Sequence, residues 1–502
     1  MAMGQHRFSF RVALLSATLI VGGASARADD GVPDNTGQAP LPTGQFITPT
    51  FATGSTFAVL NPDQPEYTAA VGNYPFFRPN GAIASKLSPD GKTLAVMTSG
   101  YNVLDDKNAS LVGNGAEFII LYDVTNPRSP VQKQTLRPAN TFVGLAFSPD
   151  GNTIYVSGGS DDQIDVFTRA QPTAGYAQSA TIQLNHGKYP GKLVNGVRLA
   201  GGIGSGQYPM AAGLSVSADG TLLAIANALN NSVSVYRTAD SSLLFDYDLR
   251  PFNTTPGSDG VAGGDTIYNV AFKGNATLYA TSLRDREVVV VDFSTGTPKL
   301  VSRISLPGSP NNLVLNKAQT TLYVSQDNSD TVAVINSASN TVVEQIDAVA
   351  PAGVLADKSN RFTGAATNNV ALSPDEQTLY VTNGGANAVA IIPLGGPAPH
   401  AVAGLLPTAW YPTTVTVSAD GGTLYVFNSK SDPGGNPNKR TSSTPSLTAT
   451  TYAGGNTGPS RYNANQYVFP ARAVRHARCP GAAGWRPRDA HQPGRGEQWL
   501  EG

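Results

Sequence analysis

The sequence predicts an all-β chain folded as a seven-bladed β-propeller of four-stranded antiparallel blades. Two observations carry this prediction. One hairpin motif occurs seven times along the 502 residues, and most copies are followed by a polar turn and a further short apolar strand. Four short strands per unit, repeated along the chain, are typical of propeller blades, whereas sandwich and barrel folds do not require one repeated motif.

The clearest copy of the motif lies at residues 145–156 and reads strand, tight turn, strand. Pro149 presets φ for the turn, and Gly151 can adopt a positive φ because it has no Cβ atom. The flanking residues are apolar and β-branched or aromatic, as strands prefer. The seven copies lie at 87–96, 145–156, 216–225, 272–280, 315–324, 372–381 and 417–426.

Strands beyond the hairpins support the blade interpretation. Third strands are predicted at 164–167, 233–236, 332–335 and 389–392, and a fourth at 341–346. The run of four valines at 288–291 does not alternate with polar residues. Such runs fit strands that are covered on both faces, as blades packed between two neighbours would be.

The two ends of the chain differ in composition from the repeats. Residues 1–28 have a basic start, an apolar run at 12–21 and a small-residue cleavage site ending at Ala28, which predict a secretory signal peptide and a periplasmic or secreted protein. We expect an arm at 29–50, the propeller at 51–430 and a flexible linker at 431–465. Residues 466–502 would provide a closing strand and then an Arg/Gly/Pro-rich tail.

Closing the ring requires joining the last blade to the first. We expect strand 56–60, with 466–469 as a further candidate, to complete the blade that starts at the seventh hairpin. The last 33 residues contain six Arg, no Lys and the only cysteine, Cys479. Such a composition is typical of GC-rich DNA translated in a wrong reading frame. The alternatives are a disordered tail or a basic arm.

Composition narrows the classes of partner. Charged residues make up 14% of the chain and the formal net charge is −1, so no overall field attracts nucleic acid or an anionic membrane. One cysteine allows no internal disulfide. We expect a monomer without a cofactor, whose partner is a small molecule or a protein.

One of the hairpins carries a family signature. Residues 380–383 read Tyr-Val-Thr-Asn, and 323–326 and 155–158 are variants of it. The chain resembles the bacterial YVTN-repeat, or YncE-like, propellers, and this resemblance implies seven blades and a periplasmic or secreted location. Through 282–288 and 410–412 it also resembles longer proteins in which such a propeller precedes an alkaline-phosphatase-like phosphoesterase domain.

The shared register of the hairpins predicts a ligand site. Four residues before the first turn residue, each innermost strand should reach the central channel. The residues there are Ala84, Gly144, Gly213, Asn269, Asn312, Asn369 and Thr414. Small residues are explained by the convergence of the blades, but three amides at one level can hydrogen-bond a ligand or ordered water.

Two further groups flank this predicted site. Tyr208, Tyr268 and Tyr411 lie next to the same strand ends and can supply aromatic contacts. Arg284, Asp285 and Arg286 lie at a turn, where they form either a solvated ion-pair cluster or a rim that recognises anions or a partner.

The sequence offers little support for catalysis. His186 and His400 are interpreted as solvated loop residues, and no metal-ligand spacing is present. The glycines at 201–206 are interpreted as a flexible loop, because a hairpin rather than a helix follows them. We therefore expect an exported binding or scaffold module rather than an enzyme. The alternative is a hydrolase, either lactonase-like or the remnant of a propeller–phosphoesterase fusion truncated by a frameshift.

Overall fold

The computed structural model describes the parts of the chain that form the ring of blades. These are residues 55–62, 81–99, 117–186, 209–251, 263–350 and 363–429, with short strands at 39–40, 46–47, 103–105, 110–112, 193–194, 197–198, 450–451, 457–458, 472–478 and 500–501. The predicted signal peptide, the closing segment 466–469 and Tyr208 lie outside the described residues.

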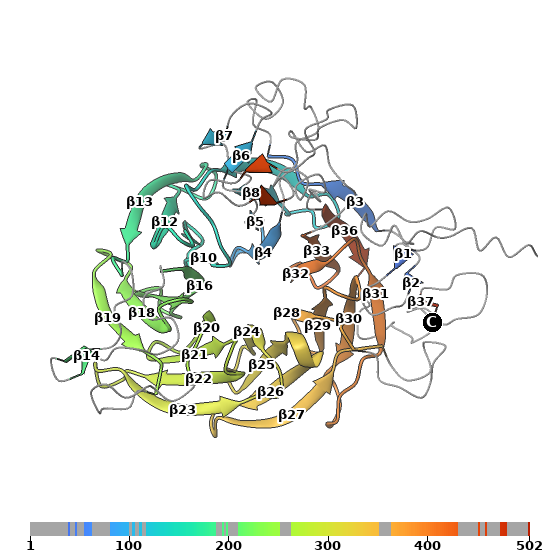
Figure 1. Cartoon of the computed structure of the whole chain (residues 1–502). Helices are drawn as coiled ribbons and strands as arrows, with labels where there is room; N and C mark the ends of the chain where they lie inside the picture. Colours follow the sequence, from blue (N-terminus) through green and yellow to red (C-terminus); the bar gives the residue numbers. More distant parts are fainter. Residues whose placement is uncertain are drawn as a thin grey trace, which may run out of the picture.

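Antiparallel four-stranded sheets surround a central channel, so the predicted all-β propeller architecture is correct (Figure 1). In the described chain, six blades each use one continuous stretch, and their strands follow in order from the channel to the rim. The first contains β4 (Ala82–Leu87), β5 (Thr93–Thr98), β8 (Phe118–Asp123) and β9 (Val131–Leu136). A separate hairpin of β6 (Val103–Asp105) and β7 (Ser110–Val112) is inserted between its second and third strands.

The next five blades repeat this construction. The second contains β10 (Leu145–Phe147), β11 (Thr153–Ser157), β12 (Gln163–Thr168) and β13 (Ala177–Gln183). The third contains β16 (Ala211–Val216), β17 (Leu222–Asn227), β18 (Ser232–Arg237) and β19 (Leu243–Asp248). The fourth contains β20 (Ile267–Lys273), β21 (Thr277–Ser282), β22 (Glu287–Asp292) and β23 (Lys299–Ser305). The fifth contains β24 (Pro310–Leu315), β25 (Thr321–Gln326), β26 (Thr331–Asn336) and β27 (Thr341–Asp347), with the 3₁₀ turn η1 (Asp327–Ser329). The sixth contains β28 (Thr367–Leu372), β29 (Thr378–Asn383), β30 (Ala388–Pro393) and β31 (Gly404–Pro407).

The seventh hairpin does not continue into a blade of the same kind, so the prediction of seven like blades is corrected to six. It forms β32 (Pro412–Val417) and β33 (Thr423–Asn428). Its sheet is completed by β36 (Arg472–Arg478), which pairs with β33, and by β3 (Thr56–Val59), which pairs with β36. The predicted strand 56–60 is therefore the outer strand of a composite sheet, and the described strand beside it lies after 466–469, in the segment predicted to be a tail.

The composite sheet fills the gap between the sixth blade and the first. The innermost strands contact one another in sequence, from β4 through β10, β16, β20, β24 and β28 to β32, and β32 contacts β4. The Thr413 hydroxyl donates a hydrogen bond to the Ala82 carbonyl, and the Ser85 hydroxyl lies 2.9 Å from that of Thr414. Polar contacts thus join the last hairpin to the first blade.

The turn motif explains why the innermost hairpins share one register. In the second blade the Ser148 hydroxyl donates to the Asp150 carboxylate at 2.5 Å and accepts the Thr153 amide at 2.9 Å. Gly151 has φ of 70°, the left-handed region that glycine enters without a Cβ penalty. The Ser–Asp hydrogen bond recurs in four other hairpins, and in each the aspartate carboxylate accepts the serine hydroxyl across the turn.

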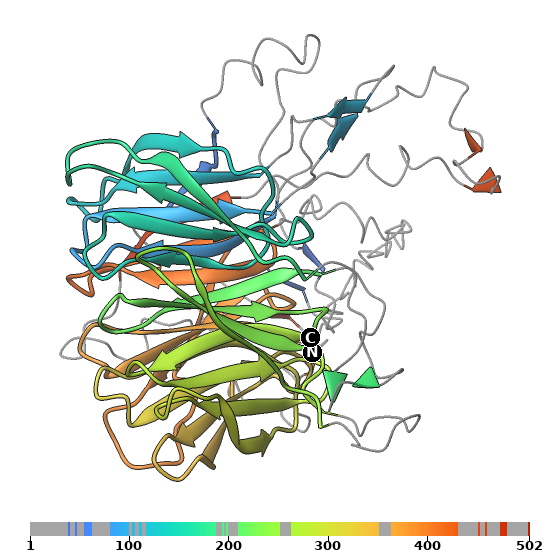
Figure 2. The same ribbon diagram turned by 90° about the vertical axis from the view of Figure 1, so that its left-hand side faces the viewer.

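The core consists of apolar side chains packed between neighbouring blades. One cluster, for example, joins Tyr279 and Val290 of the fourth blade to Leu322 and Val324 of the fifth. Figure 2 shows the blades from the side, stacked against one another. The second and third strands of the fourth blade are almost entirely buried. This packing explains the non-alternating valines of β22, which are buried on both faces.

Short strands lie outside these sheets. They are β1 (Ala39–Pro40), β2 (Phe46–Ile47), β14 (Leu193–Val194), β15 (Val197–Arg198), β34 (Thr450–Thr451), β35 (Thr457–Gly458) and β37 (Leu500–Glu501). Among the described residues, no helix is long and apolar enough to cross a membrane.

Candidate ligand site in the central channel

The innermost strands enclose a cavity of about 780 Å³ along the channel. Its wall is formed by residues of all seven innermost strands, from the aromatic mouth at Tyr268 and Tyr411 to the hairpin turns at Ser373 and Ser418. A cavity of this size falls within the range that holds small-molecule ligands. The channel is therefore the place to look for recognition chemistry.

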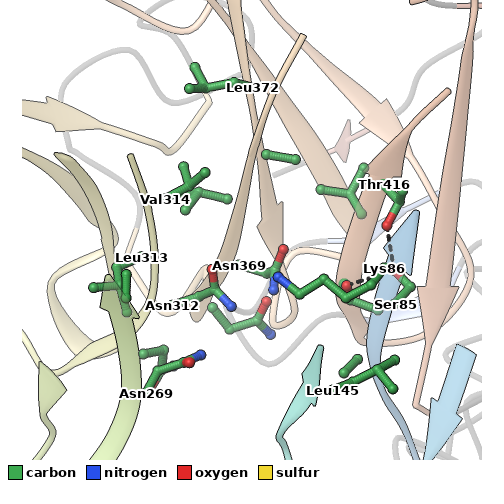
Figure 3. A pocket seen from close by; sticks show the side chains of 18 of the residues that line it. Ser85, Lys86, Leu145, Asn269, Asn312, Leu313, Val314, Asn369, Leu372 and Thr416 are labelled. Atoms are coloured by element: carbon green, nitrogen blue, oxygen red, sulfur yellow. Dashed lines mark hydrogen bonds between the residues drawn. The ribbon is translucent and has the colours of Figure 1, made fainter. Parts of the chain in front are cut away.

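The structure brings together six of the predicted site residues in the cavity wall, four of them polar residues of the innermost strands and two of them tyrosines. Asn269, Asn312, Asn369 and Thr414 all line the cavity, and Figure 3 shows the three asparagines on one side of it. The second strand of each blade holds their backbone in place. The Asn269 amide donates to the Thr281 hydroxyl at 2.9 Å, and the Asn312 amide donates to Ser325 at 3.0 Å.

The side-chain amides of these asparagines differ in how they are bonded. The Asn269 side-chain oxygen accepts the Val270 backbone N–H at 3.1 Å. For the Asn312 and Asn369 side chains, no hydrogen bond to another described residue is found, although both are half-buried. A carboxamide offers two donors and an acceptor, so both groups can bond to water or to a ligand in the channel. Thr414 is less available, because it is buried and bonded to Ser85.

Lys86 is a site residue that the sequence analysis missed. It comes from β4, and Figure 3 shows its side chain extending into the channel toward the wall that carries Asn312 and Asn369. The side chain is exposed to the channel but surrounded by protein, and this burial lowers its pKa. No hydrogen bond or ion pair joins its ammonium to any residue in the described ranges.

The hairpin register contains the signal that would have revealed Lys86. It lies two residues before the first turn residue. The other six strands carry Ala146, Ser215, Ala271, Val314, Ala371 and Thr416 there. A single lysine at a level where every other strand has an uncharged residue is not explained by packing. The same comparison of the seven strands, made four residues before the first turn residue, selects Asn269, Asn312 and Asn369.

The aromatic mouth contains two of the three predicted tyrosines. Tyr268 packs edge-on against Phe142, with ring centroids 5.9 Å apart, and burial raises its pKa to about 12. Burial also raises the pKa of Tyr411, with Asp327 contributing. The Asp327 carboxyl has a raised pKa too, because of burial and then the nearby Asp330. Both phenols therefore stay neutral and can donate hydrogen bonds at physiological pH.

The predicted charged rim does not line the channel. Arg284 is 65% exposed in its side chain and lies 3.4 Å from the Asp265 carboxylate, and the Asp285 carboxylate accepts the Asp265 backbone N–H. Arg286 has φ of 55°, and its guanidinium donates a long hydrogen bond, 3.5 Å, to the Pro307 carbonyl. These residues form a largely exposed turn with an ion pair from Arg284 to Asp265, and none of the three is among the residues that line the cavity.

His186 is buried, so its interpretation as a solvated loop residue is wrong. Its Nδ1 lies 2.7 Å from Asp162 Oδ1 and its Nε2 lies 3.4 Å from Asp246 Oδ2. Burial alone would lower its pKa, but the two carboxylates outweigh burial and raise it to about 9. The imidazole is therefore a cation at neutral pH.

A serine beside His186 superficially suggests a hydrolase triad. Ser234 Oγ lies 3.5 Å from His186 Nε2. However, this hydroxyl is fully buried, accepts a hydrogen bond from Asn227 at 2.7 Å and donates to Asp246 at 3.1 Å. A protonated imidazole cannot act as the general base that such a triad requires. The cluster of Asp162, His186, Ser234 and Asp246, named the His186 cluster below, is an ion-pair network between the second and third blades.

His400 is also paired rather than solvated. Its Nδ1 lies 2.7 Å from Glu344 Oε2, and its Nε2 lies 3.1 Å from the Gly396 carbonyl. Within the described ranges there is no group of three or more His, Cys, Asp or Glu residues that could hold a metal ion.

Comparisons with known proteins show only distant similarity. No family model and no curated protein matches the sequence. A structure of U3-55K is 11% identical, with a TM-score of 0.49, 75% of this chain covered and 92% of that chain. A structure of the RRP9 WD40 repeats is also 11% identical, with a TM-score of 0.48 and coverages of 75% and 91%. Kuenenia stuttgartiensis hydrazine synthase is 16% identical, with a TM-score of 0.47 and coverages of 70% and 93%. We draw no function from these similarities.

Proposed function

We propose that this propeller is a binding module whose central channel holds a small polar ligand. The observation that carries the proposal is the pair of carboxamides, Asn312 and Asn369, that face a cavity of about 780 Å³ without a protein partner in the described chain. A half-buried amide contributes most to the stability of a protein or a complex when its donors and its acceptor are hydrogen-bonded. A ligand in the channel would hydrogen-bond to these two amides, which have no described protein partner. It would also lie beside the tyrosines of the mouth.

The test is a binding screen of the purified protein by ligand-observed NMR, with small sugars, organic acids and amides as probes. Replacing both asparagines, Asn312→Ala with Asn369→Ala, should weaken the best probe about tenfold, roughly the loss of one or two hydrogen bonds. Gln183→Ala, on the outer strand β13, is the matched control and should bind like the wild type. Unchanged affinity in the double variant would contradict the proposal.

A second proposal concerns how the ring closes. We propose that the composite sheet of β32, β33, β36 and β3 acts as a seventh blade, because β32 contacts both β28 and β4. Removing residues 45–62 deletes β3 and should lower the melting temperature by at least several degrees, since an outer strand and the buried Leu60 are lost. A melting temperature equal to that of the full chain would refute this closure.

Export and ancestry rest on the sequence alone. We propose cleavage after Ala28 and membership of the YVTN-repeat family, because of the leader pattern and the signature at 380–383. Mass spectrometry of the secreted chain tests the cleavage site.

A further inference from the structure

A cationic side chain that nothing in the described fold uses extends into the channel. Four charged residues line the cavity: Lys86, Lys317, Asp327 and Glu376. The Lys317 ammonium donates to the Pro374 carbonyl at 2.5 Å, and its backbone N–H donates to the Glu376 carboxylate. Asp327 belongs to the tyrosine mouth and has a raised pKa from burial. Lys86 is thus the lysine of this cavity without a described protein contact for its ammonium.

The surroundings of Lys86 fit an anion better than a neutral group. Enclosed charges are costly unless they are paired, and burial among the strands lowers the pKa of Lys86 for this reason. The nearby wall is formed by uncharged residues, including Leu145, Val314 and Thr416. An incoming carboxylate would pair with the ammonium, and its second oxygen would meet the N–H donors of the facing amides.

We propose that Lys86 is the charge-recognising residue of the channel and that the ligand is a small organic acid whose carboxylate is held between Lys86 and the amides of Asn312 and Asn369. The inference rests on the proposed binding function and adds the charge of the ligand to it. The position of the carboxylate also determines how the rest of the ligand is oriented. The aromatic mouth at Tyr268 and Tyr411 would contact the remainder of the acid, since both phenols stay neutral.

A matched pair of probes tests the charge directly. Benzoate and benzamide have the same ring and nearly the same shape, but only benzoate is anionic at neutral pH. Isothermal titration should give benzoate at least about tenfold tighter binding than benzamide, equivalent to about 1.4 kcal/mol. Lys86→Met should abolish that preference, Lys86→Arg should keep most of it, and Lys317→Met should leave it intact as the control lysine in the same cavity.

The outcomes separate this inference from the proposed function. Equal binding of the two probes, both weakened by the asparagine substitutions, would overturn the role of Lys86 and leave the binding channel standing. A benzoate preference that survives in Lys86→Met would overturn it as well. If neither probe binds measurably, the Lys86 ammonium signal in ¹⁵N-lysine NMR, assigned with Lys86→Arg, decides. A signal that moves on addition of benzoate supports the inference, and an unmoved signal rejects it.

Discussion

Two groups of polar residues lie inside this propeller, and they are bonded in opposite ways. In the His186 cluster each side chain contacts at least one other member, and the imidazolium lies between the carboxylates of Asp162 and Asp246. In the channel, Lys86 and the amides of Asn312 and Asn369 have no such partners among the residues the structure describes. Both groups are surrounded by protein, but only in the His186 cluster does each side chain have a described hydrogen-bond or ion-pair partner.

The difference separates a structural role from a binding role. Buried polar groups whose bonds are satisfied stabilise one arrangement of the chain, and removing one partner leaves the others uncompensated. Polar groups that face a cavity unsatisfied contribute little to folding and are available for a ligand. The histidine, serine and acid of the His186 cluster are therefore the weaker candidate for chemistry, although they include the residue types of a hydrolase.

The largest expected contrast is in stability. Asp162→Asn removes the carboxylate that pairs with His186 at 2.7 Å, so the free energy of unfolding should fall by roughly 2 kcal/mol or more. Asparagine still tolerates the left-handed φ of 55° at this position, which limits backbone effects. The matched variant is Lys86→Met, which should leave the unfolding free energy unchanged or raise it, because it removes an enclosed charge that has no described partner. Denaturant unfolding measures both, and equal losses would remove the distinction between the two groups.

A smaller effect is expected in the pH dependence of stability. The folded-state pKa of His186, about 9, lies above the unfolded value of 6.5, so the folded state binds the proton more tightly. The stabilisation is complete below about pH 6.5 and is lost as the pH rises through 9. Thermal melts between pH 6 and 10 should show this decline in the wild type and a weaker one in His186→Gln. If the melting temperature of His186→Gln falls with pH as much as that of the wild type, groups other than His186 cause the pH dependence.

The sequence predicted the repeating part of the fold because its signals are local. The Ser-Pro-Asp-Gly turns determine hairpins from a few adjacent residues, and the asparagines that their register selects, Asn269, Asn312 and Asn369, line the cavity. The count of like blades failed at the last hairpin, where the partners of β33 and β36 come from distant parts of the chain. A pairing of that kind has no signature in neighbouring residues.

The two errors in the polar residues have a related cause. The loop composition around His186 predicts a solvated side chain, but in the folded chain this side chain lies between carboxylates from β19 and from the turn before β12. Lys86 was overlooked because only its register position, compared across all seven hairpins, distinguishes it from a solvated lysine. Pairing in three dimensions, not residue type, decides which polar group is structural.

The most direct test of the account is a crystal structure of the protein with benzoate bound. We expect density for the carboxylate in the channel, within about 3 Å of Lys86 Nζ and of the Asn312 or Asn369 amide nitrogen, with the ring toward Tyr268 and Tyr411. Benzoate bound only elsewhere, with the channel unchanged and Lys86 still unpaired, would contradict it.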